Sequence, residues 1–174
     1  MKPEEFEIFT TCVPGLELEL LTEIKKIGFK QTKLKAGGIS FFGDWHDVWR
    51  ANFYLRGATK VLVRFASFRA THLAQLDKLS HKLSWENLLH YKKSFRVETV
   101  CRKSKIYHSG AASQRISKAI SNKIDAKEDP NSDIIIKTRI SSDICTISLD
   151  SSGEGLHKRG YKIATGKAPI RETL

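Results

Sequence analysis

The sequence predicts an α/β (α+β) fold built from two successive parts. Over the first 68 residues, β-rich runs and amphipathic helical patterns follow one another in the order β-α-β-β-α-β. After Ala70 the order changes to two helical segments, a strand, a long amphipathic helix and two more strands. A length of 174 residues accommodates one ordinary domain or two small ones. We therefore expect two small α/β domains.

The first part opens with a strand over residues 6–12, which Pro14-Gly15 ends. The following segment predicts a helix that stops at Gly28, a residue that readily adopts the left-handed conformation found after helices. Its apolar residues recur at helical spacing and define one face: Leu16, Leu20, Ile24 and Ile27.

Residues 33–42 predict a β-hairpin around a Gly37-Gly38 turn. Asp44 is placed to cap a helix over 45–55, and residues 61–68 close the segment as a strand. This order of elements is ferredoxin-like, with two helices on one face of an antiparallel sheet.

In the second part, Thr71 is expected to cap a helix that turns Leu73, Leu76 and Leu79 inward, and Ser84 to start a shorter helix. A strand over 95–100 follows, and then a basic loop over 102–109.

The next segment, 111–124, predicts a helix whose isoleucines recur every four residues, with basic residues outside. Residues 129–131 (Asp-Pro-Asn) break the pattern. Strands over 134–140 and 144–149 then predict a hairpin joined through 141–143. Residues 155–166 form a polar linker. The isoleucines of the helix are Ile116, Ile120 and Ile124.

Charge is unevenly distributed between the two parts. The chain carries 30 Lys and Arg against 19 Asp and Glu, a net charge of +11. Residues 1–60 hold nine basic and eight acidic residues, a net of +1, whereas residues 61–174 hold 21 and 11, a net of +10. Such a basic surface attracts polyanions. The simpler alternative is a solvated face that only aids solubility.

The sequence lacks the common catalytic motifs. It has no glycine-rich loop of the phosphate-binding types, and its six histidines show no metal-ligand spacing. Its three cysteines are far apart, which predicts neither a disulfide framework nor a zinc site. Helix capping accounts for the carboxylates of Asp44-His46-Asp47, and Cys101, although beside two basic residues, has no identifiable base. We expect no catalytic residue and no metal site.

Nothing in the sequence predicts a membrane segment. No apolar run reaches the roughly 18 to 20 residues that span a bilayer, and residues 1–5 are too acidic for a secretory signal. We therefore expect a cytoplasmic location and no membrane partner.

Binding chemistry remains, and RNA is the expected ligand. Basic and aromatic residues interleave in 102–109 and 157–162, a combination that neutralises phosphates and stacks unpaired bases. The helix from Ala111 also directs its N-terminal amides at the preceding loop, where a phosphate is favoured. The candidate RNA-binding residues are Arg102, Lys103, Lys105, His108, Arg115, Lys118, Lys137, Arg139, Lys158, Arg159 and Tyr161.

Two stretches resemble a known family. Residues 149–161 read L-D-S-S-G-E-G-L-H-K-R-G-Y and residues 168–174 read A-P-I-R-E-T-L, with weaker support from 49–56 and 66–68. Together with the element order, they resemble the N-terminal half of the bacterial THUMP-containing large-subunit rRNA guanine-N2 methyltransferases. The resemblance covers the whole chain. In place of the Asn-Ser found in many relatives before the basic helix, this chain has His108-Ser109, which puts any role carried over to that position in doubt.

The resemblance implies a ferredoxin-like N-terminal domain over 1–69 followed by the core of a THUMP domain over 70–154. A THUMP domain defined by a sequence profile would span about 45–152. Residues 155–174 would be a linker and the start of a methyltransferase domain, with a first helical turn from Pro169 that lacks its packing partner. In the family, that third domain binds S-adenosylmethionine and methylates guanine. The resemblance therefore implies that this chain binds RNA, in the family context 23S rRNA, and that it holds no cofactor and catalyses nothing by itself.

Two other interpretations stay open. THUMP domains also serve tRNA-modifying enzymes, so the parent protein could be a tRNA methyltransferase. Alternatively, the basic face could bind an acidic protein partner. Sequence leaves the oligomeric state undecided.

Overall fold

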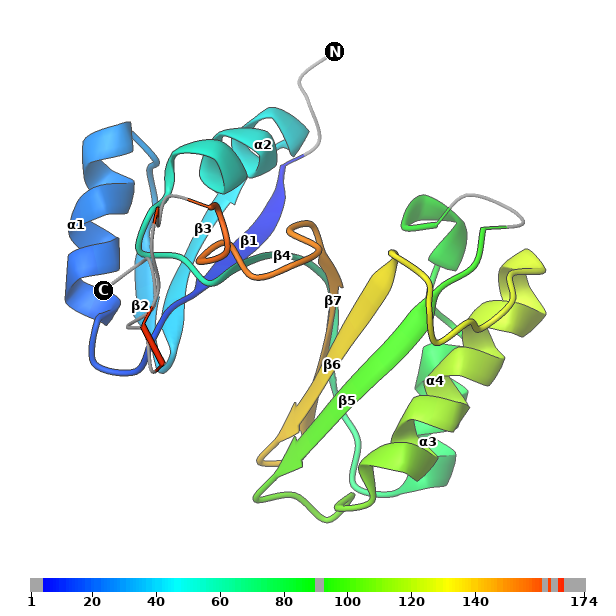
Figure 1. Ribbon diagram of the computed structural model, residues 1–174. Coiled ribbons are helices and arrows are strands. Elements are labelled where there is room, and N and C mark those ends of the chain that lie inside the picture. The colour runs from blue at the N-terminus through cyan, green and yellow to red at the C-terminus, as the bar shows by residue number, and fades with distance from the viewer. Residues whose placement is uncertain (1–4, 90–92, 161–162, 164–165, 168–174) are drawn as a thin grey trace. The chain divides into compact units, whose positions relative to one another are not determined.

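The computed structural model describes residues 5–89, 93–160, 163 and 166–167 (Figure 1). The chain divides into two compact units, one made of residues 1–63 together with 151–174 and the other of residues 64–150. The predicted helical turn from Pro169 and the candidate residue Tyr161 lie outside the described residues.

The first unit has the predicted ferredoxin-like order. Its elements are β1 (Phe6–Thr11), α1 (Glu17–Ile27), β2 (Lys33–Lys35), β3 (Gly38–Gly43), α2 (Trp45–Tyr54) and the start of β4 (Lys60–Arg69). The strands lie in the order β2-β3-β1-β4, and each described pair is antiparallel. Both helices contact β3.

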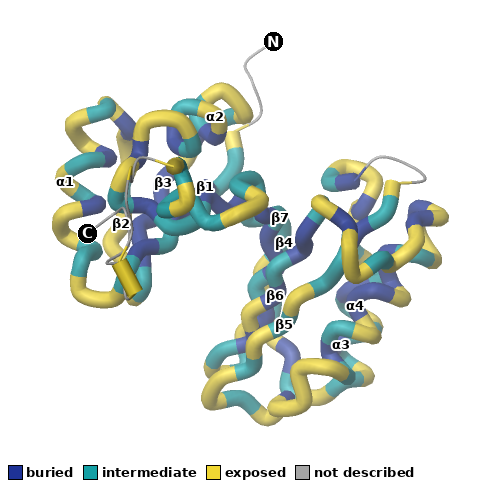
Figure 2. The backbone as a smooth tube through the Cα atoms, viewed as in Figure 1, coloured by how far each residue is buried: buried dark blue, intermediate teal, exposed yellow. Residues whose placement is uncertain are grey.

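The core of this unit forms where the helices meet the sheet. Leu20 and Ile24 of α1 and Val48 and Ala51 of α2 are buried, as the helical spacing predicts. They meet the buried side chains of Ile8, Ile39 and Phe41. Figure 2 shows the same alternation of buried and exposed positions along the helices.

Local signals explain most helix ends here. The Asp44 carboxylate accepts a hydrogen bond from the Asp47 amide at 3.1 Å, which confirms the predicted cap of α2. Gly28 ends α1 with φ +96°. The predicted turn was displaced by one residue, because Ala36 and Gly37 make the turn and Gly38 already belongs to β3. A Cβ on Gly38 would lie 2.0 Å from the Thr10 carbonyl oxygen, so close strand approach requires glycine there.

The second unit contains the rest of β4 and the elements α3 (Leu73–Ser80), the 3₁₀ helix η1 (Trp85–Asn87), β5 (Arg96–Arg102), α4 (Ser109–Ile124), β6 (Ile135–Ser141) and β7 (Ile144–Asp150). Its strands lie in the order β4-β7-β6-β5. The predicted β6–β7 hairpin is confirmed, and β5 runs parallel to β6. Parallel neighbours need a long crossover, which α4 supplies.

The helices α3 and α4 pack side by side on one face of this sheet (Figure 1). The predicted isoleucine face of α4 is buried in a core with Ile136, Ile140 and Ile147. The fully buried Trp85 satisfies its indole N–H by donating to the Ser80 carbonyl at 2.8 Å. One face of the sheet is therefore covered by helices.

Two predicted helix starts in this unit were wrong by one or two residues. The N-cap of α3 is His72, and Thr71 instead donates its amide to the Gln75 side chain at 3.0 Å. Helix α4 begins at Ser109, because His108 caps it. It ends at Ile124 as predicted, where Asp125 adopts φ +48°. A histidine at the N-cap is a less distinctive sequence signal than Ser, Thr or Asp.

Candidate RNA-binding surface

The loop between β5 and α4 is built around one buried side chain. Ile106 is 4% exposed and packs in the core of the second unit. Lys103 adopts φ +46°, and the Ser104 hydroxyl donates to the Arg102 carbonyl at 2.9 Å. These features close the loop tightly, and they leave the side chains of Arg102, Lys103 and Lys105 exposed.

The turn between β6 and β7 holds this loop in place. Ser142 and Asp143 both have positive φ, which is the conformation of a two-residue hairpin turn. The Asp143 carboxylate accepts from the Lys105 amide at 2.8 Å, and the Asp143 amide donates to the Ser104 hydroxyl at 3.1 Å. The sequence analysis did not identify Asp143 as a residue that holds the loop. The Ser-Asp pair between two β-branched runs indicated only the turn.

His108 joins the loop to α4. Its Nδ1 accepts a hydrogen bond from the Ala111 amide at 3.1 Å, so its imidazole acts as the helix N-cap. Tyr107 beside it is 84% exposed. An exposed ring next to several cations at a helix N-terminus is suited to stack a base while the cations contact phosphates.

Arg115 and Lys118 lie on the outer face of α4, opposite its buried isoleucines, and both are exposed. Arg115 Nη1 is 3.9 Å from a carboxylate oxygen of Asp77 in α3. At that distance the carboxylate neutralises the guanidinium only weakly. These two residues extend the loop's positive charge along α4.

Lys137 and Arg139 of β6 lie on the other face of the sheet. They alternate with Ile136, Thr138 and Ile140, which are buried on the side that the helices cover. The candidate residues of the second unit therefore divide between the loop with α4 and the open sheet face.

The open sheet face contains its own ion pairs. Lys137 hydrogen-bonds to Glu98 of β5, and Arg96 Nε lies 3.3 Å from the same carboxylate. Burial by itself raises the pKa of Glu98, but the Lys137 hydrogen bond and the two positive charges outweigh it and lower the pKa overall. Arg64, which the sequence analysis did not select, donates to the Ser148 hydroxyl at 3.1 Å.

The candidate residues after β7 belong to the first unit. Lys158 is exposed and lies 3.4 Å from Glu154. The Arg159 guanidinium donates from Nη1 to the Phe53 carbonyl at 2.8 Å and from Nη2 to the Asn52 and Leu55 carbonyls at 2.7 and 2.8 Å. Its positive charge thus caps the C-terminus of α2, where carbonyls lack helical partners. A contact between Arg159 and RNA stays a prediction.

Among the described residues, no group of three or more His, Cys, Asp or Glu side chains is arranged to hold a metal ion. Burial raises the pKa of the Cys101 thiol, and it raises that of Cys145 to about 12, with Cys101 adding to the effect. The idea that neighbouring cations activate Cys101 is therefore not supported. No described helix is long and apolar enough to cross a membrane.

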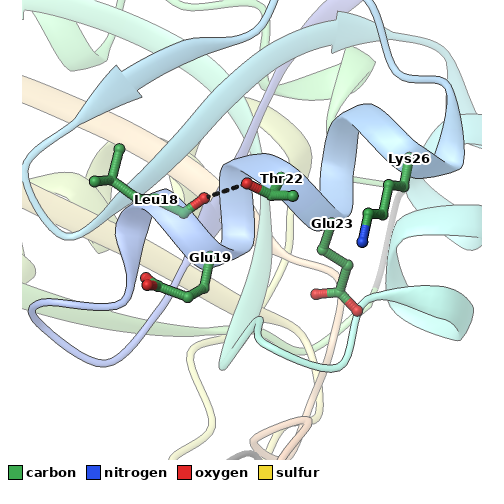
Figure 3. A pocket seen from close by; sticks show the side chains of 5 residues that line it. All are labelled: Leu18, Glu19, Thr22, Glu23 and Lys26. Atoms are coloured by element: carbon green, nitrogen blue, oxygen red, sulfur yellow. Dashed lines mark hydrogen bonds between the residues drawn. The ribbon is translucent and has the colours of Figure 1, made fainter.

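A hollow of about 360 Å³ lies along α1, lined by Leu18, Glu19, Thr22, Glu23 and Lys26 (Figure 3). The Glu23 carboxylate accepts from the Arg56 and Gly57 amides at 2.7 and 2.9 Å, which ties α1 to the segment after α2. With two carboxylates in its lining, this hollow is poorly suited to a phosphate.

Two family models match the chain in the order that the fold shows. The RlmL ferredoxin-like domain matches residues 7–62, and the THUMP domain matches residues 70–150.

Similar proteins bear the names of methyltransferases. The chain is 30% identical to "Putative RNA methyltransferase YpsC" of Bacillus subtilis, over 98% of this chain and 46% of that protein. It is 30% identical to the ribosomal RNA large subunit methyltransferase K/L of Cellvibrio japonicus, over 97% of this chain and 23% of that protein. The structure described as "Crystal structure of SMU.472, a putative methyltransferase complexed with SAH" superposes with a TM-score of 0.83 at 26% identity, over 99% of this chain and 47% of that one.

The chain spans less than half the length of each of these relatives. What it shares with them is the ferredoxin-like unit and the unit that carries the basic loop and α4. The chain therefore consists of an RlmL-type ferredoxin-like domain followed by a THUMP domain.

Proposed function

We propose that this chain is the RNA-binding region of an S-adenosylmethionine-dependent rRNA guanine-N2 methyltransferase. In this proposal it captures 23S rRNA in the cytoplasm for a catalytic domain that lies outside these 174 residues. The THUMP match and the ribosomal RNA methyltransferase named among the relatives support an RNA partner.

The observation that carries the proposal is the fixed basic loop at the start of α4. Three exposed cations, Arg102, Lys103 and Lys105, and the exposed ring of Tyr107 lie in the segment that leads into the N-terminus of α4. The loop is already held by Ile106 and by Asp143, so little ordering entropy opposes RNA binding there.

The methyl donor is assigned to the other domain. The described loops that lead from a strand into a helix contain at most one glycine each, which does not fit the glycine-rich turn that such a cofactor requires. The residues of this chain would bind and orient the RNA, and the absent domain would supply the methyl group from S-adenosylmethionine.

The first test measures RNA binding by fluorescence anisotropy at several salt concentrations, using 23S rRNA fragments, tRNA and duplex DNA. We expect the RNA affinity to fall linearly on a double logarithmic plot, by about 0.7 log units per single-stranded phosphate neutralised. A flat salt response, or equal binding of DNA, would contradict the proposal. Preference for tRNA would redirect it to a tRNA methyltransferase.

The second test uses radiolabelled methyl donor. The parent protein should place label on the exocyclic amine of a guanine in 23S rRNA, whereas the 174-residue chain should place none. Turnover by the 174-residue chain would show that catalytic residues lie within it, against the assignment made above.

A further inference from the structure

Helix α2 carries a row of exposed aromatic side chains. Trp45, Trp49 and Phe53 recur every four residues and therefore share one face, opposite the buried Val48 and Ala51. Trp49 is 63% and Phe53 is 72% exposed. Single exposed apolar residues are ordinary, but a contiguous row of large rings marks a surface that binds a partner. We call Trp45, Trp49 and Phe53 the aromatic row.

The rings of the aromatic row rest against neighbours of the first unit. The Trp45 ring meets Phe6 edge-on with centroids 5.2 Å apart, and the Phe53 ring meets Tyr54 in the same way at 4.9 Å. Such edge-to-face contacts restrict the rings. The row is therefore a shaped surface rather than a set of independent side chains.

The charges around the aromatic row favour a protein partner over a nucleic acid. Arg50, on the same helix, bonds to Asp47 at 2.9 Å and to the Ile27 carbonyl at 3.0 Å, so its guanidinium is used within the unit. Residues 1–60 carry a net charge of only +1, and of the cations that follow β7 in the same unit, Arg159 donates to backbone carbonyls and Lys158 lies 3.4 Å from Glu154. An RNA site is built from stacking rings with many cations, whereas rings without surplus cations suit an apolar protein surface.

The segment that follows β7 is bound to the helix that carries this row. Asn52 of α2 donates to the Ser151 hydroxyl at 3.0 Å and accepts from the Ser152 hydroxyl at 2.8 Å. Arg159 then binds the carbonyls of Asn52, Phe53 and Leu55. Residues 151–159 are thus fastened to the end of α2 that carries Phe53.

We infer that the aromatic row is the docking surface for the catalytic domain that follows these 174 residues in the parent protein. This inference rests on the proposed function, since it takes the following domain to be the methyltransferase. The relatives are more than twice as long as the region they share with this chain. A tether that continues from residues 151–159 starts beside the row and holds the next domain near it, which raises the effective concentration of that domain at the row. Arg159 is a positioning residue, because it sets where the tether starts.

Hydroxyl-radical footprinting tests the inference by comparing the 174-residue chain with the parent protein. Oxidation of Trp49 and Phe53 should be several-fold slower in the parent, whereas Leu18 of α1 and Leu34 of β2, which are exposed but lie outside the row, should oxidise at equal rates in the two proteins. Equal rates at Trp49 would overturn the inference. Protection of Trp49 in the 174-residue chain alone, growing with concentration, would assign the row to a second copy and would also overturn it.

A double variant, Trp49→Ala with Phe53→Ala, gives an independent readout in the parent protein. It should increase the rate of proteolysis after residue 160 several-fold, while the matched variant Leu18→Ala with Leu34→Ala, which also removes exposed apolar side chains, should not. If the aromatic variant instead lowers RNA affinity of the 174-residue chain, the row binds RNA and the inference fails. Absence of RNA binding by the unaltered chain would refute the proposed function. The footprinting experiment would still test whether a following domain docks on the row.

Discussion

The backbone amide of Lys105 donates a hydrogen bond of 2.8 Å to Oδ1 of Asp143, across 38 residues of sequence. An acidic residue therefore holds the most basic loop of the chain in its conformation. The carboxylate adds negative charge where a phosphate is expected to bind, so its structural and electrostatic effects oppose each other.

This opposition gives a prediction for Asp143. Replacement by Ala removes the acceptor of the Lys105 amide. It also places alanine at φ +65°, a conformation that aspartate tolerates because its side chain can hydrogen-bond locally and alanine cannot. We therefore expect the free energy of unfolding to fall by about 1–3 kcal/mol. RNA affinity should fall, even though the substitution removes one negative charge beside the loop. Asp143→Asn, which keeps an oxygen acceptor and tolerates positive φ, should bind RNA at least as well as the unaltered chain. Urea unfolding and anisotropy measure the two effects, and stronger binding by Asp143→Ala would show that loop order is unimportant.

Charge reversal of the loop should weaken RNA binding without unfolding the chain. Lys103→Glu with Lys105→Glu changes two exposed side chains, and two lost phosphate contacts predict a salt slope about 1.4 smaller. The matched control is Lys30→Glu with Lys33→Glu, which makes the same charge change on exposed residues of the first unit. Equal losses in both variants would mean that only net charge matters.

His108 is expected to contribute to stability through its cap. His108→Ala should destabilise the second unit by about 0.5–2 kcal/mol, because the Ala111 amide loses its acceptor. His108→Asn should restore that stability, since asparagine is a strong N-cap. Thermal unfolding of the two variants measures the cap, and an RNA affinity that stays low in His108→Asn would reveal a separate contact of the imidazole with RNA.

Arg159 should stabilise the first unit more than Lys158 does. Arg159→Ala removes charge-assisted hydrogen bonds to three carbonyls at the end of α2, at a cost of about 1–3 kcal/mol. Lys158→Ala removes one exposed, screened ion pair and should cost little. Arg159→Lys should restore only part of the loss, because an ammonium cannot reproduce the fork of a guanidinium. Chemical denaturation compares the three, and equal stability of the two alanine variants would refute the capping role.

Glu98 allows the open sheet face to be tested separately from the loop. Glu98→Gln frees Lys137 and Arg96 from their carboxylate, so RNA affinity should rise if this face contacts RNA and should stay constant if only the loop does.

The pH dependence of stability follows from the lowered pKa of Glu98. A folded-state pKa below the unfolded value, which is about 4.3 for Glu, means that the ion pairs stabilise the fold above that value. This contribution is lost as pH falls through the folded-state pKa. Acid unfolding of Glu98→Gln should therefore show a weaker dependence on pH in this range than the unaltered chain, and identical curves would exclude the effect.

Most of the fold could be predicted because its signals are local. The four-residue spacing of Ile116, Ile120 and Ile124 identifies the buried face of α4 without any tertiary information, and the structure confirms it. The errors fell at element ends, such as His108 and Gly38, where the deciding contact comes from a cap of unusual type or from a neighbouring strand.

The candidate site was predictable in composition but not in arrangement. Lys137 and Lys103 are both basic residues of the second unit. Lys137 lies on the open sheet face, where it is paired with Glu98, whereas Lys103 is exposed in the loop. Alternation along β6 tells which residues share a face, but only packing of α4 decides which face is covered.

The sequence by itself determined the order of helices and strands, the faces they bury, and the concentration of positive charge after residue 60, because these depend on residue type and spacing. Tertiary structure decided what each cation does. Arg159 reads as an RNA contact beside Lys158 and Tyr161, and only the fold brings the carbonyls of Asn52, Phe53 and Leu55 to its guanidinium. A charge belongs to the residue, but its hydrogen-bond partners come from wherever the folded chain places its acceptors.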